Sequence, residues 1–479
     1  MLRHQLPALI CVAFLVPAAA SARPLHIAQE RQLFVDDYIV EGVENVAFTL
    51  HQPEKHPGNP VLLADKPWEA KSVALYGTVL FDDEEKLFKM WYRAIEDTCY
   101  ACYATSQDGV HWHKPVLNAR EYKGSTENNI VLGSVSPKFY LDGFAVIKDI
   151  EEDDPGQRYK MLTYNGDRRF AAMVSPDGIH WNGPVNAKKH DTGDVVSMYY
   201  DTGLEQYVAL LKRRYVFEDG RRVRARLTAF SEDFVRWTAP DFVLVPDEHD
   251  PPSTEFYSHV AYMYEGLRIG YLGIFTKSTE LIDSQLCSSR DGHTWQRYRR
   301  RTPLLPNTPG TFDGGMLLAN ASGCIVRDGT IWIYYCGYAS DHAGRTAGTP
   351  EVTNGLGLAR LRQDGFVSAD AGPEGGVLLT KPFVCPDAPM HVNADAPDGE
   401  VRVTLLDAGK PLATSTPLTG DSLDAVVGFS KAGPDIAGRT VRARFQMRNA
   451  KLYAFWFAHE RGTIRREQAH ATAPTAGRN

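Results

Sequence analysis

One seven-residue motif recurs along the chain and constrains its fold more than any other feature. The motif is Ser-x-Asp-Gly-x-x-Trp, and it occurs at Ser106–Trp112, Ser175–Trp181 and Ser289–Trp295. A copy at Ser231–Trp237 lacks the glycine, and a worn fifth copy lies at Gln363–Ser368. Successive copies lie roughly 60 residues apart, a spacing that indicates one array of repeated structural units.

The chemistry of this motif is that of a tight turn followed by an anchor. Asp-Gly supplies the positive φ that a tight hairpin needs, and the Ser and Asp side chains can bond nearby backbone N–H groups. The Trp then buries a large surface against a neighbouring unit. Alternating apolar runs such as Leu87–Tyr92 and Tyr100–Thr105 separate the copies. About four strands per repeat predict a propeller blade, and the copies predict five blades over residues 71–372.

The flanking regions do not carry the repeat. Residues 23–70 are predicted to be a lead-in, with a strand over Leu33–Val40 followed by a Pro-rich loop. Residues 373–458 are predicted to form a small β-sandwich, and residues 459–479 a disordered tail. The predicted fold is therefore all-β: a five-bladed β-propeller followed by a small C-terminal β-sandwich. The sandwich strands are expected at Val377–Phe383, Glu400–Leu406, Ala425–Phe429, Thr440–Gln446 and Leu452–Phe457.

Residues 1–22 are predicted to be a signal peptide. A short polar start precedes an apolar run from Leu6 to Ala20, which is too short to cross a bilayer comfortably. The small residues Ala20-Ser21-Ala22 follow, so cleavage is expected near Ala22. We therefore expect a secreted or periplasmic protein. No later segment is long and apolar enough for a span, so no membrane partner is expected.

Charge and motif content exclude some partners and cofactors. The formal net charge is −7, whereas a general nucleic-acid binder needs a basic face that displaces counterions. No nucleic-acid partner is therefore expected. The sequence has neither a Gly-rich phosphate loop nor a pair of histidines at metal-ligand spacing, so it implies no cofactor and no metal. It leaves the oligomeric state and the pairing of the cysteines open.

Four carboxylates are predicted to meet at one mouth of the propeller channel. Each blade begins with its innermost strand at the channel, so the first residues of these strands converge although they are far apart in sequence. Asp142, Asp194, Glu255 and Asp313 occupy such positions, whereas the first blade opens with Leu75–Gly77. Converging carboxylates repel one another, which raises at least one pKa. Glycoside hydrolysis uses such a pair, one carboxylic acid as proton donor and one carboxylate as nucleophile or base.

Further polar and aromatic residues are predicted to contact a sugar at the same mouth. Some lie on loops that return to this face, and the aromatic ones could stack on a sugar ring. Taken alone, each loop charge is more simply a solvated surface group, and the cluster Arg221–Arg224 is most simply a solvated hairpin edge. The predicted substrate-binding residues are Asp313, Tyr76, Arg93, Trp68, Glu69, Asp37, Arg213 and His342.

The repeated motif followed by a short sandwich resembles the five-bladed glycoside hydrolases, families 32 and 43 and their relatives. The lead-in segments Gln32–Tyr38 and Asn59–Glu69 look like those of a bacterial branch of that group. The stretch from Gly438 to Phe455 is similar to the closing strands of a family 32 sandwich. The resemblance covers nearly the whole chain after residue 22, and it is more specific for the fold than for the substrate.

The resemblance implies positions for the catalytic carboxylates. Family 32 enzymes have a nucleophilic Asp on the first blade, a transition-state-stabilising Asp in Arg-Asp-Pro, and a general-acid Glu in Glu-Cys. Counting blades by the Trp motif places the second and third at Asp194 and Glu255, where only the carboxylates match. The first-blade motif is absent, and Asp142, Asp37 or Glu69 could replace its Asp. We favour Asp142, because it lies on a predicted inner strand.

Together these features predict an exported glycosidase that acts on a carbohydrate substrate. Glu255 is the predicted general acid, Asp194 the pKa tuner and anchor for sugar hydroxyls, and Asp142 the base or nucleophile. Two alternatives remain open at this stage. The lost first-blade motif favours a non-catalytic carbohydrate-binding propeller, and the basic loops would suit a glycoside phosphorylase of the same fold.

Overall fold

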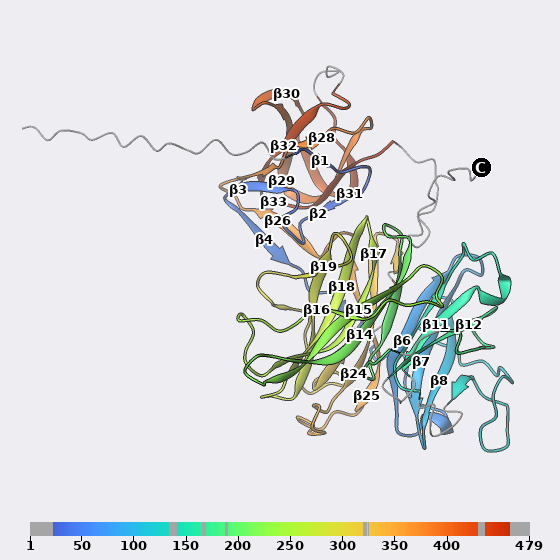
Figure 1. Ribbon diagram of the computed structural model, residues 1–479. Coiled ribbons are helices and arrows are strands. Elements are labelled where there is room, and N and C mark those ends of the chain that lie inside the picture. The colour runs from blue at the N-terminus through green and yellow to red at the C-terminus, as the bar shows by residue number, and fades with distance from the viewer. Residues whose placement is uncertain are drawn as a thin grey trace, which may run out of the picture.

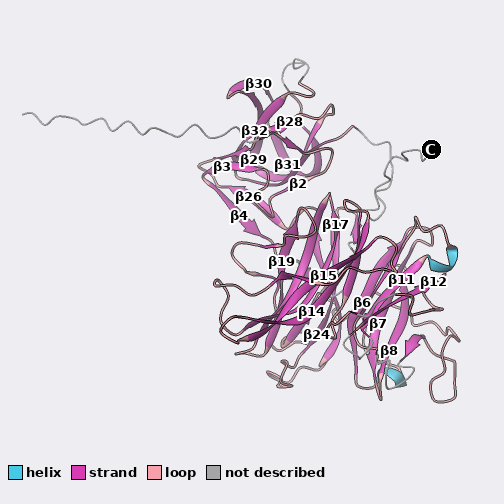
Figure 2. Cartoon of the chain, viewed as in Figure 1, coloured by secondary structure: helices cyan, strands magenta, loops and turns pink. Residues whose placement is uncertain are grey.

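The protein is built almost entirely of β-strands (Figure 2). The computed structural model describes residues 23–133, 141–164, 169–186, 190–319, 323, 325–429 and 436–459. Two short 3-10 turns, η1 (Pro67–Glu69) and η2 (Pro155–Gln157), are the only helical elements in these ranges. The strands form two bodies, a larger one with most of the repeat motifs and a smaller one that gathers both ends of the described chain (Figure 1). The all-β prediction is confirmed, whereas the predicted signal peptide and all but the first residue of the predicted tail lie outside the described residues.

The larger body is a ring of antiparallel units. Strand β6 lies against β10, β10 against β13, and β13 against β17, while β24 and β25 return to β6 and close the ring. The first unit contains β6 (Ser72–Asp82), β7 (Leu87–Ile95), β8 (Cys99–Ser106) and β9 (Ile130–Gly133). The second contains β10 (Phe144–Lys148), β11 (Tyr159–Tyr164) and β12 (Phe170–Ser175). The third contains β13 (Ser197–Asp201), β14 (Gln206–Val216), β15 (Arg222–Ser231) and β16 (Asp241–Leu244).

The remaining strands of the ring form one ten-stranded sheet made of two antiparallel units. A single parallel pairing, Ile282 with Met316, joins them. The number of blades therefore stays a prediction, because two of the five units share a sheet. The fourth unit contains β17 (Thr254–Tyr264), β18 (Leu267–Thr276), β19 (Leu281–Ser289), β20 (Gln296–Arg297) and β21 (Pro303–Leu305). The fifth contains β22 (Met316–Leu318), β23 (Ile325–Arg327), β24 (Thr330–Tyr338), β25 (Asn354–Arg362) and β5 (Glu54–Lys55).

The recurring motif forms the turn that its sequence predicts. In the first copy, the Gly109 N–H donates to the Ser106 hydroxyl at 2.8 Å, and the backbone N–H of His111 donates to Asp108 at 2.8 Å. The copies that begin at Ser175 and Ser289 repeat both hydrogen bonds, and the copy that begins at Ser231 repeats the bond to the aspartate. The turns also join neighbouring units, since the Tyr334 hydroxyl of the fifth unit donates to the Gly109 carbonyl at 2.7 Å. The motif aspartates are thus structural.

The smaller body is one twelve-stranded sheet that curls over a common apolar core (Figure 1). Segments from both ends of the chain contribute, since β3 pairs with β27 and β4 pairs with β26. The N-terminal strands are β1 (Leu25–His26), β2 (Gln32–Leu33), β3 (Val40–Glu44) and β4 (Val46–Leu50). The later strands are β26 (Val367–Ala371), β27 (Gly376–Thr380), β28 (Phe383–Val384), β29 (Met390–Asp407), β30 (Lys410–Thr414), β31 (Leu418–Val426), β32 (Thr440–Arg448) and β33 (Ala450–Phe457).

The predicted strand Leu33–Val40 is wrong, because the chain bends in its middle. Only Gln32–Leu33 and Val40–Glu44 are strands. Between them the N–H of Tyr38 donates to the Asp36 carboxylate at 3.1 Å, which closes a local turn. Asp36 also forms an ion pair with Arg290 of the ring at 2.9 Å. The apolar pattern was correct about burial, but Asp36 favours a turn over an extended backbone.

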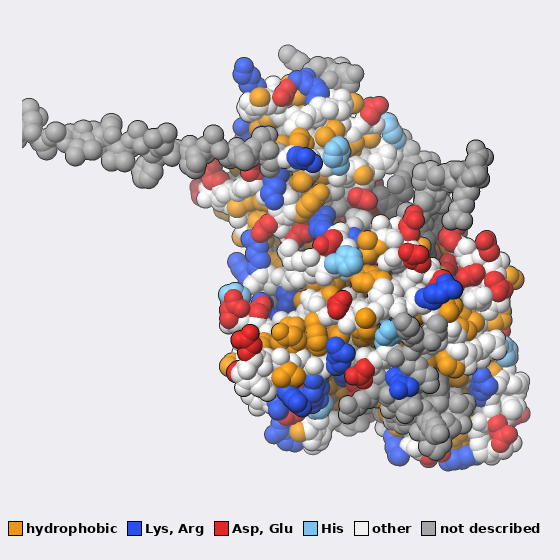
Figure 3. Space-filling view, viewed as in Figure 1, with side chains coloured by type: hydrophobic (Ala, Val, Ile, Leu, Met, Phe, Trp, Pro, Cys, Tyr) orange, Lys and Arg blue, Asp and Glu red, His pale blue; other side chains and the backbone are white. Residues whose placement is uncertain are grey.

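The described residues contain neither a membrane-spanning helix nor a metal-ligand group. No helix there is long and apolar enough to span a bilayer. In the same residues, no group of three or more His, Cys, Asp or Glu side chains could hold a metal ion. On the face shown in Figure 3, basic and acidic side chains are intermixed over both bodies.

Candidate functional site

The innermost strands of the first and fourth units each carry a bulge. The register of β6 against β7 shifts between Ala74 and Thr78, and that of β17 against β18 shifts between Phe256 and Ser258. A β-bulge re-aims side chains, and bulges are common next to active sites. Tyr76 lies in the first bulge and Tyr257 in the second. The two phenols influence each other's pKa, so the bulges bring two aromatic side chains to one place.

Asp142 of the second unit contacts Arg93 of the first. The guanidinium of Arg93 forms an ion pair with the Asp142 carboxylate and lies 4.1 Å from the centre of the Tyr76 ring. Burial raises the pKa of Asp142, and the nearby charge of Asp194 adds to the rise, although Arg93 opposes it. Asp142 is therefore a carboxyl group that retains its proton to a higher pH than an exposed aspartate.

Asp194 of the third unit lies beside Asp142 but in a different electrostatic environment. The Gly143 N–H donates to the Asp194 carbonyl at 3.2 Å, which holds the two segments together. The ammonium group of Lys212 forms an ion pair with the Asp194 carboxylate and lies 4.4 Å from the centre of the Tyr257 ring. Although burial acts the other way, Lys212 lowers the pKa of Asp194 overall. The Asp194 side chain is 44% exposed, so it is open to a ligand.

Glu255 of the fourth unit is the third carboxylate of this group. It forms an ion pair with Arg224 of β15, whose guanidinium lies 5.6 Å from the centre of the Tyr257 ring. The Glu255 side chain is only 5% exposed. Asp194 and Glu255 thus have their basic partners beside the Tyr257 ring, and Asp142 lies next to Asp194 with Arg93 as its own partner.

Sequence reasoning missed several residues of this cluster. Arg224 was expected at a solvated hairpin edge, but it faces the neighbouring unit and holds Glu255. Arg226, two residues on along the same face of β15, is fully buried, and it donates to the Tyr257 carbonyl at 3.2 Å. Alternation along β15 was the only available signal, because Arg224 and Arg226 necessarily face the same side. Burial raises the pKa of Tyr338, which borders Arg93, to about 12.

Two of the predicted substrate-binding residues, Tyr76 and Arg93, belong to the cluster, and a third, His342, lies at its edge. The His342 ring lies 5.5 Å from that of Tyr257, centre to centre, and its imidazole is 3.4 Å from the Glu280 carboxylate. Arg213 instead stacks over Phe242, with its guanidinium 5.3 Å from the ring centre. Its neighbour Lys212 contacts Asp194 instead, because adjacent residues of a strand point to opposite faces.

The other four predicted residues make structural contacts. Asp313 is buried, and its carboxylate accepts hydrogen bonds from Lys55 at 2.6 Å and from Tyr335 at 3.0 Å. This ion pair attaches β5, a strand from the N-terminal segment, to the fifth unit. Asp37 forms an exposed ion pair with Arg299. The sequence could not predict the Asp313 contact, since the two partners are 258 residues apart.

Trp68 and Glu69 anchor the short turn η1 in the first unit. The indole N–H of Trp68 donates to Asn129 at 2.8 Å. The fully buried Glu69 carboxylate accepts hydrogen bonds from Lys114 at 2.7 Å and Tyr92 at 2.5 Å. Both side chains therefore have hydrogen-bond partners within the protein, and their contact with a sugar stays a prediction.

Comparison with known proteins gives structural likeness only. No family model matches the chain, and no curated protein matches it. Among solved structures, a putative glycoside hydrolase from Bacteroides ovatus is similar at 14% identity, covering 65% of this chain and 97% of its own, with a TM-score of 0.44. A glycosyl hydrolase from Bacteroides ovatus is 15% identical over 67% of this chain and 97% of its own, also with a TM-score of 0.44.

A third similar structure comes from the GH130 family of mannoside phosphorylases, which contains glycoside hydrolases that target β-1,2 mannosidic linkages in Candida mannan. It is 17% identical over 67% of this chain and 97% of its own, with a TM-score of 0.43. These three structures do not include a member named as family 32 or 43, so that resemblance stays a prediction. The evidence for function therefore lies in the contacts of Asp142, Asp194 and Glu255.

Proposed function

We propose that this chain is an exported glycoside hydrolase that cleaves an oligo- or polysaccharide at the mouth of the propeller. The observation that supports this most directly is the pair Asp142 and Asp194. Burial raises the pKa of Asp142, whereas Lys212 lowers the pKa of Asp194. Hydrolysis of a glycosidic bond needs one carboxyl group that carries a proton and one that is ionised. Neighbouring acids whose pKa values are pushed apart meet that need.

In this proposal Asp142 donates the proton to the leaving oxygen, and Asp194 acts as nucleophile or as the base that activates water. The sequence-based assignment gave the proton to Glu255. Solvent accessibility favours Asp142 as the proton donor, because the side chains of Asp142 and Asp194 are 17% and 44% exposed, while that of Glu255 is 5% exposed. A general acid must reach the substrate within hydrogen-bonding distance. Glu255 then serves to hold Arg224 beside the site.

The aromatic residues of the cluster would bind the sugar itself. Tyr76 lies under Arg93, and Tyr257 lies under Lys212, so each ring carries a cation on one face. This arrangement holds both rings in fixed positions. A sugar presents hydroxyl groups to the charged side chains and C–H groups to the remaining ring surfaces. Arg226, which donates to the Tyr257 carbonyl, would be a positioning residue for that ring.

The roles of the two aspartates can be separated by the leaving group. The full-length protein should release reducing sugar from one or more members of a panel of plant, fungal and bacterial polysaccharides. Asp142→Asn should lower this rate about 100- to 10,000-fold. It should retain much more of its activity on a nitrophenyl glycoside of the same sugar, because nitrophenolate leaves without protonation. Asp194→Asn should lose activity on both substrates.

Glu255→Gln distinguishes the two assignments of the proton donor. Under the present proposal it should lower both activities together, by altering the position of Arg224. If instead Glu255→Gln spares the nitrophenyl glycoside and Asp142→Asn does not, the donor is Glu255. Glycan binding without release of sugar from the whole panel would favour a binding protein and contradict hydrolysis.

The pKa shifts also set the direction of the pH dependence. The rate should decrease on the alkaline side as Asp142 loses its proton, at a pH above that of an ordinary aspartate. It should decrease on the acid side as Asp194 becomes protonated, at a pH below the ordinary range. A rate measured from acid to neutral pH should therefore be bell-shaped. The alkaline limb should be absent from Asp142→Asn when the nitrophenyl substrate is used.

A glycoside phosphorylase is the second candidate, and the basic side chains favour it. Arg93, Lys212 and Arg224 lie beside the three carboxylates, and a phosphate oxyanion could replace water as the nucleophile near such groups. Adding inorganic phosphate should then raise the rate of cleavage and produce a sugar phosphate. A rate and a product that do not depend on phosphate would leave hydrolysis as the activity.

A further inference from the structure

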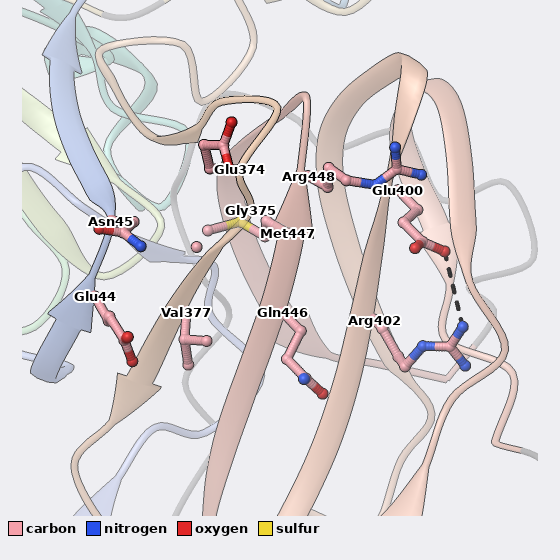
Figure 4. Close-up of a pocket in the computed structure, with 11 residues that line it drawn as sticks. Glu44, Asn45, Glu374, Gly375, Val377, Glu400, Arg402, Gln446, Met447 and Arg448 are labelled. Atoms are coloured by element: carbon pink, nitrogen blue, oxygen red, sulfur yellow. Dashed lines mark ion pairs between the residues drawn. The ribbon is translucent and has the colours of Figure 1, made fainter.

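A concave site lies on the curled sheet, in the body that does not contain the carboxylate cluster. Its volume is about 360 Å³, which is within the range of small-ligand pockets. Segments from three parts of the chain form it: the end of β3, the loop before β27, and the paired strands β29 and β32 (Figure 4). A ligand bound there would therefore contact the N-terminal segment and the C-terminal sheet together.

The strand register explains how the floor of this cavity is built. Glu44 pairs with Val377, Val377 pairs with Gln446, and Gln446 pairs with Arg402. These residues form one row across four neighbouring strands, about 5 Å apart. Two residues further along β32 and β29, Arg448 pairs with Glu400 on the same face.

Four polar side chains of this cavity have no partner within the described part of the chain. Among the described residues, the side chains of Glu44, Glu374, Gln446 and Arg448 make no hydrogen bond or ion pair with another residue. Glu400 and Arg402 form a long ion pair of 3.7 Å (Figure 4). All four side chains are exposed, so carboxylate acceptors, a guanidinium donor and an amide line one concavity with their hydrogen-bonding groups open to a ligand.

The mixture of groups selects the chemistry of the ligand. The cavity is lined by charges of both signs, so Glu44 and Glu374 would repel an anion and Arg448 would repel a cation. A neutral molecule with many hydroxyl groups satisfies all of them, because each hydroxyl both donates and accepts. A carboxylate and a guanidinium can each bond two adjacent hydroxyls at once. Val377 in the centre of the floor leaves a small apolar surface for the C–H face of a ring.

We propose that this cavity binds a neutral glycan chain, separately from the cluster at the mouth of the propeller. The proposal shares with the proposed function only the expectation that the ligand is a carbohydrate. The cavity would retain a polysaccharide on the protein while the carboxylate cluster acts on another part of the same polysaccharide. None of the described residues that line the cavity is aromatic, so affinity depends on hydrogen bonds, and we expect millimolar to micromolar binding for a short oligosaccharide.

The test is calorimetric titration of the full-length protein with neutral tetrasaccharides of glucose, mannose, galactose and arabinose, and with an acidic tetragalacturonide. The titration uses Asp194→Asn as background, so that the ligand is not consumed. The double substitution Gln446→Ala/Arg448→Ala should weaken binding of the preferred neutral tetrasaccharide at least about tenfold, which corresponds to the loss of one hydrogen bond to a charged group. Lys410→Ala removes an exposed charge outside the cavity lining and is the matched control.

The outcomes separate this site from the proposed catalytic site. Loss of binding in the double variant, with unchanged hydrolysis of a small nitrophenyl glycoside when Asp194 is restored, supports the proposal. Three results overturn it: no neutral tetrasaccharide binds at millimolar concentration, binding is the same in the double variant, or the acidic tetragalacturonide is preferred. If the unsubstituted protein cleaves none of the substrates but binds a neutral tetrasaccharide that the double variant does not bind, the proposed function fails and this proposal stands.

Discussion

The stability of the ring should depend strongly on Asp82, at the end of the innermost strand of the first unit. Its side chain is fully buried, and it accepts hydrogen bonds from Lys89 at 2.7 Å and from Lys148 at 2.9 Å. Lys148 belongs to the second unit, so this contact joins two units. The two lysines hold the pKa of Asp82 far below its usual range. Asp82→Asn keeps the shape of the side chain but removes the charge that both ammonium groups face.

The size of the effect follows from what the lysines retain. Removing one partner of a buried ion pair costs about 3–5 kcal/mol. Lys89 keeps the partly exposed Glu85 at 2.6 Å, and Lys148 keeps Glu84. We therefore expect the lower end of the range, a loss of about 3 kcal/mol in the free energy of unfolding. Urea denaturation followed by tryptophan fluorescence measures this value, which changes the unfolding equilibrium constant more than 100-fold.

A matched control lies in the same turn. Asp83 forms an exposed ion pair with Lys86 at 3.3 Å, and such pairs contribute little. Asp83→Asn should change the free energy of unfolding by less than about 0.5 kcal/mol. The reasoning is refuted if Asp82→Asn and Asp83→Asn unfold at the same urea concentration. The sign of the pH effect is also fixed: because the folded pKa of Asp82 is depressed, its contribution is present above the unfolded pKa and decreases as the pH falls towards the folded one.

Three further predictions concern other positions. Lys212→Met should raise the pKa of Asp194, so the acid limb of the rate profile should move to higher pH, whereas an unmoved limb would show that another group sets it. Gly77→Ala should lower the melting temperature and the activity together, because a Cβ at that position would lie 2.0 Å from the Trp91 carbonyl oxygen; a wild-type melting curve would contradict the tight bulge. Asp364 lies between the last strand of the ring, β25, and the first later strand of the smaller body, β26, and its buried carboxylate pairs with Arg31 at 2.7 Å. Asp364→Asn should therefore lower the free energy of unfolding by about 3 kcal/mol, and an unchanged unfolding midpoint would contradict this role.

Local pattern predicted much of the fold, because its signals are short-range. The Ser-x-Asp-Gly turn is determined by residues within one motif, and the strands that follow it alternate as the sequence suggests. The inner ends of the strands at Asp142 and Asp194 could likewise be located by counting motifs. The order of the elements also led to the prediction that acids from different units meet; Asp142 and Asp194 do lie beside each other, whereas Asp313 is paired with Lys55.

The contacts that decide a residue's role could not be predicted in the same way. Lys212 and Arg213 are adjacent, so one step in strand register decides which of them faces Asp194. The partner of Asp313 is Lys55, on strand β5, which comes from the N-terminal segment and joins the same sheet. A sequence shows that Asp313 begins an inner strand, but it does not show that a distant lysine occupies its carboxylate. Pairings between distant segments are determined by the closed ring as a whole.

Under the proposed function, the ion pairs of the carboxylate cluster would connect catalysis to the packing of the ring. Asp142 of the second unit pairs with Arg93 of the first, which lies opposite the start of β6. Strand β6 ends at Asp82, and β10, which follows Asp142, ends at Lys148; these two residues also form an ion pair. The same two units are thus joined at the mouth and at the opposite end of their inner strands. A rotation between them would change the Asp142–Arg93 contact and with it the environment that raises the Asp142 pKa. Asp82→Asn should therefore alter the alkaline limb of the rate profile as well as stability, although Asp82 is remote from the substrate.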